Sequence, residues 1–290
     1  MKKFLCLLAL LLSGCETIVQ IDLPEHQSRL VVDGIFEANE RWQIGVSRSV
    51  GILGNEFPGP VENATVEIWR DGQLLTALNH ADQGIYVSAS EIVEIGKTYE
   101  LRIAAPGFDP VSATAVAPDP VSLDSITYTV ESIPFGGQRV NFSVQFNDDP
   151  AQKNYYEIFV LTRDFDGGWF NNYFSSTDPA IVETNTSIEI GEEREFAGEI
   201  ALFDDALFDG ETYDLSLRYY PWFGYQEVLV VLNTVTENVY LHNRAMELQE
   251  ETDDNPFAEP VQHYSNIANG YGIFGGVNPV SRRFVFNFGN

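Results

Sequence analysis

Cys15 is the residue whose surroundings point most directly to a defined chemistry. Two lysines, Lys2 and Lys3, precede an unbroken run of nine apolar residues from Phe4 to Leu12, and Leu12-Ser13-Gly14-Cys15 follows. This is the lipobox pattern of bacterial type II signal peptides, in which the thiol forms a thioether to diacylglycerol and small residues admit the peptidase. The apolar run is far shorter than the roughly 20 residues that span a bilayer. We therefore expect a signal peptide over residues 1–14 and a membrane anchor of acyl chains on Cys15.

The remaining nucleophiles and metal ligands do not form a recognisable catalytic motif. The histidines are His26, His80, His242 and His263, and none has the spacing of a zinc site. The chain has no Gly-x-Ser-x-Gly element, and Cys15 is the only cysteine outside the signal peptide, which excludes an intramolecular disulfide and a cysteine metal site. We expect a protein that is not an enzyme and has no cofactor. A hydrolase with a dispersed triad, invisible in one sequence, is the third alternative.

Three acidic groups have the residue types of a calcium site, which needs several oxygen ligands. They are Asp164-Phe165-Asp166-Gly167, Asp204-Asp205 with Asp209-Gly210-Glu211, and Asp253-Asp254-Asn255. None completes the twelve-residue loop of an EF-hand. Acidic turns between strands are the favoured interpretation of each group, calcium binding stays the alternative, and we predict no residue as a metal ligand.

Two aromatic clusters are the candidate ligand-binding residues. Residues 168–174 and 219–225 are both rich in aromatic side chains and are interrupted by Gly, Asn or Pro. Exposed aromatic side chains suit sugar or peptide recognition or a protein interface, whereas aromatic strand residues also pack between sheets. Both interpretations stay open for each cluster. The residues predicted to bind a ligand are Trp169, Tyr173, Tyr220, Trp222 and Tyr225.

Composition limits the classes of partner. The formal charge is −27, and loss of Lys2 and Lys3 with the signal peptide makes it −29. So acidic a chain repels nucleic-acid phosphates and is not attracted to anionic lipid. An apolar content of 44% and an aromatic content of 13% exclude a disordered acidic tail.

The positions of these residues depend on a chain that reads almost entirely as strands. Trp42, Ile44 and Val46 alternate with polar residues, residues 64–69 alternate in the same way, and Asp71-Gly72 is a hairpin turn signal. Strands recur every ten to fifteen residues or so, which is typical of a β-sandwich of immunoglobulin type. After a stiff linker at residues 116–120, further strands are expected at 125–130, 140–146, 155–162, 195–203, 213–219, 227–232 and 283–288.

One segment has helical instead of strand periodicity. Residues 236–251 lack Gly and Pro and place Leu241, Ala245 and Leu248 on one face, after the capping-box pattern of residues 234–237. The predicted fold is all-β: a lipidated tether over 15–28, an immunoglobulin-like β-sandwich over 29–117, and a larger C-terminal sandwich over 118–290 that carries this one long helix.

Several stretches resemble the DUF4249 family of Bacteroidota lipoproteins. They are the lipobox, Arg29 to Gly34, Glu62 to Val66, Gly84 to Tyr86, Asn255 to Pro260, and Ser265 to Gly276, of which Asn-Ile-x-Asn-Gly-x-Gly-x-Phe at 266–274 is the most specific. The resemblance covers essentially the whole mature chain. It implies a cell-envelope protein whose gene often lies beside that of a TonB-dependent outer-membrane receptor, and it carries over no catalytic residue.

We therefore expect an outer-membrane lipoprotein, held by its lipid anchor at the cell surface, that assists or binds substrate for a TonB-dependent nutrient receptor. The acidic residues Glu16, Asp22 and Glu25 after the lipid cysteine resemble a surface-export signal, although they are sparse, and the leaflet that carries Cys15 stays open. The alternative is a structural or adhesive surface lipoprotein without a transport partner. The expected partners are the receptor, the membrane and a small nutrient ligand, and not nucleic acid.

Overall fold

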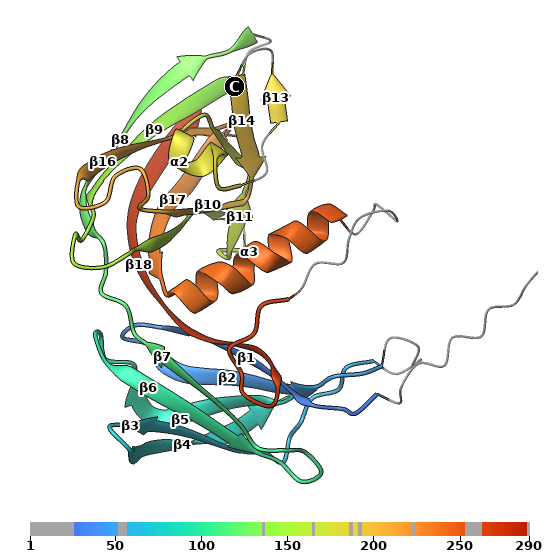
Figure 1. Ribbon diagram of the computed structural model, residues 1–290. Coiled ribbons are helices and arrows are strands. Elements are labelled where there is room, and N and C mark those ends of the chain that lie inside the picture. The colour runs from blue at the N-terminus through green and yellow to red at the C-terminus, as the bar shows by residue number, and fades with distance from the viewer. Residues whose placement is uncertain are drawn as a thin grey trace, which may run out of the picture.

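The computed structural model describes residues 26–51, 57–134, 137–163, 166–185, 188–190, 193–221, 224–252 and 263–288. Strands dominate these residues, and no helix among them is long and apolar enough to cross a membrane. The all-β fold predicted from the sequence is confirmed. The molecule consists of two stacked sandwiches, joined along the long last strand (Figure 1).

The first seven strands form the lower sandwich in Figure 1. They are β1 (Leu30–Glu37), β2 (Arg41–Arg48), β3 (Thr65–Arg70), β4 (Gln73–Asp82), β5 (Ile85–Ile92), β6 (Thr98–Ala104) and β7 (Val111–Val116). Their hydrogen-bonded order is β1-β2-β5-β4 followed by β3-β6-β7, with the β3–β4 hairpin joining the two layers. This is the A-B-E-D and C-F-G strand order of the immunoglobulin sandwich.

Aromatic side chains fill the space between these two layers. Trp42 of β2 meets Tyr99 of β6 edge-on, with ring centroids 4.7 Å apart, and Phe36 of β1 lies 4.8 Å from Trp42. The Tyr99 hydroxyl accepts a bond from the Glu94 backbone N–H at 2.9 Å and donates to the Glu94 carbonyl at 3.3 Å. A tyrosine near the start of the sixth strand that bonds back to the preceding corner is the tyrosine corner of immunoglobulin-like domains. The first sandwich is therefore immunoglobulin-like in strand order and in this local feature.

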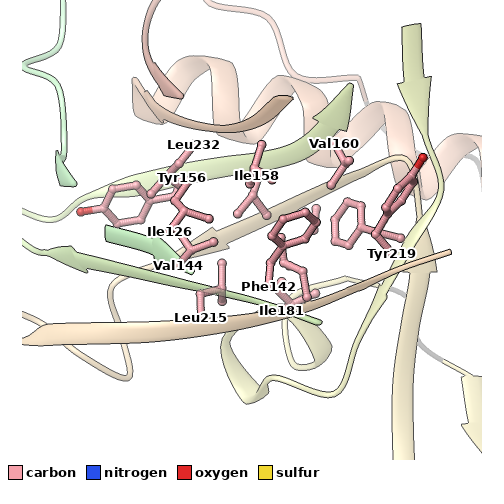
Figure 2. Close-up of a cluster of buried hydrophobic side chains, with 14 of the residues drawn as sticks. Ile126, Phe142, Val144, Tyr156, Ile158, Val160, Ile181, Leu215, Tyr219 and Leu232 are labelled. Carbon is pink, nitrogen blue, oxygen red and sulfur yellow. The ribbon is translucent and has the colours of Figure 1, made fainter. Parts of the chain in front are cut away.

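The second sandwich places a six-stranded sheet against the remaining strands of the larger sheet. The six-stranded sheet contains β8 (Ser122–Ser132), β9 (Gln138–Asn147), β12 (Phe174–Ser176), β13 (Ile188–Ile190), β14 (Glu193–Gly198) and β16 (Thr212–Tyr219). Facing it are β10 (Tyr155–Arg163), β11 (Trp169–Asn172), β15 (Ile200–Asp204), β17 (Gly224–Val235) and β18 (Tyr271–Phe288). Figure 2 shows Phe142 and Val144 of β9 pointing toward Ile158 and Val160 of β10 across the core.

The last strand, β18, belongs to both sandwiches. Its first residues pair in parallel with β1, from Val31 opposite Tyr271 to Glu37 opposite Val277, and the remainder pairs antiparallel with β17. Two hydrophobic clusters result, and the one inside the first sandwich includes Ile267 and Phe274. Residues 118–290, predicted as one C-terminal unit, therefore also contribute to the N-terminal core. The division into two domains at residues 117 and 118 stays a prediction.

The helices lie outside the sheets. α2 (Pro179–Val182) is a single turn capped by Asp178, and α3 (Glu237–Thr252) matches the helix predicted over 236–251 within one residue. α3 packs against β18 and β10, beside the second sandwich (Figure 1).

The sequence interpretation was wrong about three local elements. Residues 195–203 are two strands in different sheets, β14 and β15, because the chain crosses between layers at Glu199. Residues 168–174, which lie in none of the strands expected from the sequence, contain β11 and the start of β12. The final strand begins at Tyr271, twelve residues before the predicted start at Arg283. Glycines at 272, 275 and 276 concealed this strand, because glycine weakens the strand pattern in sequence.

Candidate functional site

Three of the five predicted binding residues are exposed on the second sandwich. Trp169 is 40% exposed, Tyr173 67% and Tyr220 45%, and Phe170, which the sequence interpretation did not single out, is 46% exposed. Trp222 and Cys15 lie outside the described residues, and Tyr225 is described only by its backbone on β17. The site is therefore built from Trp169, Phe170, Tyr173 and Tyr220, which we call the aromatic surface.

Two strand pairings place these four residues near one crossing of the chain, where Trp169 and Phe170, adjacent on β11, point to opposite faces of the strand. β11 pairs with the end of β10, with Trp169 opposite Arg163, and the chain then passes through Tyr173 into β12 of the other sheet. β12 pairs antiparallel with β16, with Phe174 opposite Tyr219. Tyr173, just before Phe174, and Tyr220, just after Tyr219, therefore lie at the same end of this pair of strands. The aromatic surface thus lies where the chain crosses from one layer to the other.

Trp169 lies beside a network of charges. The Arg163 guanidinium lies 6.0 Å from the Trp169 ring centroid and bonds to Glu227 at 3.2 Å. Arg283 reaches the other oxygen of Glu227 at 2.6 Å. An exposed aromatic ring bordered by paired charges combines an apolar contact with hydrogen-bonding groups at its rim, which suits a polar organic ligand or a protein interface.

The aromatic cluster near Tyr220 divides between core and surface. Tyr219 is fully buried, its hydroxyl lies 3.1 Å from Gln226 Oε1, and burial raises its pKa. Tyr220, the next residue, points to the opposite side of the strand and is exposed. The sequence left open whether this cluster packs in the core or is exposed. Tyr219 packs in the core, and Tyr220 is exposed. Ligand binding by Trp169, Tyr173 and Tyr220 stays a prediction.

A second feature is a cluster of carboxylates at the edge of the second sandwich. One oxygen each from Asp148, Asp205 and Asp209 lies within 4.8 Å of the others, the spacing that one cation could bridge. Asp205 and Asp209 belong to one of the acidic groups noted in the sequence, whereas Asp148 was missed because it lies on a distant loop. Of the other two groups, Asp164 and residues 253–255 lie outside the described residues.

Protein donors already occupy the buried carboxylates of this cluster. Asp148 accepts bonds from Tyr156 at 2.5 Å, from the Asn154 side chain at 3.0 Å and from the Gly210 N–H at 2.8 Å. Asp205 accepts from the Asn154 N–H at 2.5 Å. Burial raises the pKa of Asp205, and the negative charges of Asp148, Asp204 and Asp209 add to this. The arrangement ties the loop before β10 to the loop after β15.

The histidines have local structural contacts. His80 Nε2 accepts a bond from the Gly84 N–H at 3.3 Å, and its ring packs on Tyr86. His242 Nδ1 lies 3.1 Å from the Tyr264 carbonyl oxygen, and His26 Nε2 lies 3.1 Å from Ser49 Oγ. In the part of the chain that the structure describes, the Asp148 cluster is the one group with metal-ligand geometry, and it contains no histidine.

A buried carboxylate lies under helix α3. Glu157 of β10 is 9% exposed and accepts bonds from Asn233 Nδ2 of β17 at 2.8 Å and Asn243 Nδ2 of α3 at 3.3 Å. Burial raises its pKa, and the two amides oppose this effect. The carboxylate is enclosed between helix and sheet, so it contributes to packing and not to an accessible site.

The most specific family stretch joins the two sandwiches. Asn266 donates to the Phe274 carbonyl at 2.7 Å and accepts from the Phe274 N–H at 2.9 Å, which closes the turn that starts β18. Asn269 and Gly272 both have positive φ, and a Cβ on Gly272 would lie 1.9 Å from the Val32 carbonyl oxygen. Packing of the start of β18 against β1 therefore explains the Asn and Gly residues of this stretch.

Comparison with known protein families identifies the family of this chain. The profile described as "Domain of unknown function (DUF4249)" matches residues 16–283. The chain belongs to the DUF4249 family. A search of curated protein sequences finds no match.

Two solved structures are similar to this DUF4249 chain at low scores. The chicken interferon gamma receptor alpha chain has a TM-score of 0.23 and 14% identity, and covers 72% of this chain and 90% of its own. Bovine butyrophilin has a TM-score of 0.21 and 8% identity, and covers 71% of this chain and 92% of its own. The immunoglobulin-like description of the first sandwich rests on its strand order and its tyrosine corner.

Proposed function

We propose that this DUF4249 protein is a non-enzymatic, lipid-anchored outer-membrane protein that assists a TonB-dependent nutrient receptor, docking on the receptor or binding its nutrient through the aromatic surface. The observation that carries the proposal is the exposure of Trp169, Phe170, Tyr173 and Tyr220 on paired or strand-flanking segments. Large aromatic side chains left in solvent at a defined position are the residues most enriched at binding surfaces.

The sequence before the first sandwich supports the anchor. The lysines, the short apolar run and Leu12-Ser13-Gly14-Cys15 agree with lipidation at Cys15. The family resemblance supports the Bacteroidota envelope and the receptor partner. The charge of −27 favours a protein or neutral nutrient as ligand over nucleic acid.

The partner can be tested by affinity purification of the full chain from detergent-solubilised outer membranes. We expect a receptor barrel to be recovered with it. Recovery of the chain without any barrel would contradict the receptor partnership and favour the alternative, a structural or adhesive surface lipoprotein. An adjacent receptor gene would support the partnership independently.

The aromatic surface can be tested by Trp169→Ala and Tyr220→Ala, with Leu207→Ala as the matched control. Leu207 is a large apolar side chain, 51% exposed and outside the aromatic surface. Loss of barrel recovery in the two aromatic variants, with recovery retained in the control, is the expected result. Equal recovery in all three variants, with unchanged melting temperatures, would remove these residues from the site.

A further inference from the structure

The described chain enters the first sandwich at one end, beside the start of β1 and the end of β2. Ser28 Oγ donates to the Ser49 carbonyl oxygen at 2.6 Å, and the Arg29 N–H donates to Ser49 Oγ at 2.9 Å. His26, the first described residue, also lies beside Ser49. Residue 26 therefore has a fixed position on this end.

The same end presents an amphipathic set of exposed side chains. Phe57 is 88% exposed, more than any other large hydrophobic side chain that the structure describes. Its segment is held to β2 by a bond from the Arg48 N–H to the Gly59 carbonyl at 3.0 Å. The Arg29 guanidinium lies 5.5 Å from the ring centroid of Tyr271, which is 43% exposed. We call Arg29, Phe57 and Tyr271 the anchor-end surface.

We propose that the anchor-end surface contacts the lipid bilayer to which Cys15 holds the chain. The inference rests on the proposed lipid anchor and adds the orientation of the protein on the membrane. Ten residues, 16–25, separate Cys15 from His26. Even a fully extended chain of this length spans at most about 40 Å, so the anchor keeps this end of the first sandwich within that distance of the headgroups.

The chemistry of the three side chains suits the boundary between headgroups and acyl chains. Phenylalanine gains from leaving water, roughly ten- to hundredfold in partition. Tyrosine and arginine place an apolar body at the boundary and a polar tip among the headgroups. Because the anchor already holds the chain at the membrane, this weak attraction is sufficient to keep the anchor-end surface in contact with the bilayer. Asp109 lines a hollow with Arg29, so this end carries both signs of charge and does not repel a neutral lipid surface.

The proposed orientation places the aromatic surface away from the membrane. β18 starts at Tyr271 in the anchor-end surface and runs into the second sandwich, where Phe284 pairs with Val228, itself opposite Thr162 (Figure 1). Thr162 pairs with Phe170, so the aromatic surface lies at this level. At about 3.3 Å per residue, the path along β18, which Figure 1 shows to be curved, is about 40 Å and sets the upper limit of this separation. The exposed aromatic side chains would thus contact a part of the partner that lies away from the membrane.

The test attaches the mature chain, residues 15–290, to phosphatidylcholine vesicles through the Cys15 thiol and a maleimide-headgroup lipid. Chemical attachment makes the result independent of lipidation in the cell, so failure of the anchor proposal and failure of the docking proposal are distinguishable. Phe57→Trp is compared with Leu74→Trp, and the unchanged chain supplies the background fluorescence. Leu74 is a 48% exposed side chain at the opposite end of the first sandwich. Lipids brominated on the acyl chains report contact by quenching the added tryptophan.

We expect bromolipid to quench at least half of the fluorescence added in Phe57→Trp and to leave that added in Leu74→Trp unchanged. Equal quenching of both variants would overturn the orientation, and quenching of neither would overturn the contact. A second readout is the emission maximum of Phe57→Trp, which should shift to the blue on vesicles. The same shift for the chain free in solution would indicate self-association and would also overturn the proposal.

Discussion

The two sandwiches differ in what they bury and expose beside their aromatic cores. The first encloses Trp42, Tyr99, Phe36 and Phe274 in one buried cluster and closes its corner with the Tyr99 hydroxyl. The second has an aromatic core of its own but leaves the aromatic surface in solvent and encloses carboxylates instead. The first sandwich therefore closes around one aromatic cluster, whereas the second combines an aromatic core with buried carboxylates and the exposed aromatic surface.

The largest effect is expected at the junction of the two sandwiches. Gly272→Ala would place a methyl group 1.9 Å from the Val32 carbonyl oxygen at a φ of +101°, so β18 could not pair with β1 as it does. We expect a loss of more than about 4 kcal/mol in the free energy of unfolding, or no folded protein. Urea denaturation of the chain without its signal peptide and lipid measures this free energy.

Gly72→Ala is the matched control, because Gly72 has a φ of +73° and no atom within 4 Å of its would-be Cβ. It should cost about 1 kcal/mol from the backbone conformation alone. Equal losses in the two glycine variants would show that the close approach of β18 to β1 does not hold the sandwiches together.

The tyrosine corner should carry the next largest effect. Tyr99→Phe removes both bonds to the Glu94 backbone inside the first sandwich, and we expect a loss of about 1–2 kcal/mol. Tyr173→Phe, which removes an exposed hydroxyl of the second sandwich, should change stability by less than about 0.5 kcal/mol. Thermal denaturation compares the two variants. An unchanged melting temperature for Tyr99→Phe would contradict the conclusion that the bonds of Tyr99 stabilise the first sandwich.

Glu157 should make the stability of the second sandwich depend on pH. Because burial raises the pKa of Glu157, the unfolded chain ionises first as the pH rises, and the folded state loses stability until its own pKa is passed. Glu157→Gln removes this loss because it cannot ionise, and its amide oxygen can still accept the bond from Asn233 Nδ2. The variant should therefore be more stable than the original chain at about pH 8 and equal to it at about pH 4.

Urea denaturation across this pH range measures the effect, with Glu62→Gln as control because Glu62 is exposed. A Glu157→Gln variant that is less stable at about pH 8 would mean that the amides of Asn233 and Asn243 favour the ionised carboxylate more than burial opposes it.

Much of the first sandwich could be predicted because its strands alternate cleanly. Trp42, Ile44 and Val46 face the core, and the residues between them face outward, as the period-two pattern requires. The start of β18 could not be predicted in this way. Gly275 and Gly276 are required there by the close approach of Val239 and Pro118, which are distant in sequence.

The candidate sites were predictable only in their residue types. Alternation places Tyr219 and Tyr220 on opposite faces, but it does not say which face another sheet covers. Asp205 and Asp209 are neighbours in sequence, whereas Asp148 joins them through the pairing of β9 with β16 and of β10 with β15. Long-range strand pairing therefore decides what local composition leaves open.

The smallest effect on stability and the most direct effect on function are expected together at the aromatic surface. The measurement is quantitative recovery of the receptor barrel with Trp169→Ala/Tyr220→Ala, compared with Leu207→Ala and the unchanged chain. Both side chains of the double variant are exposed, so its melting temperature should stay the same. We expect at least a tenfold loss of barrel recovery in the double variant alone, which is the scale of truncating interface aromatics. Full recovery of the barrel by a folded double variant would contradict the central claim that the second sandwich presents the binding surface.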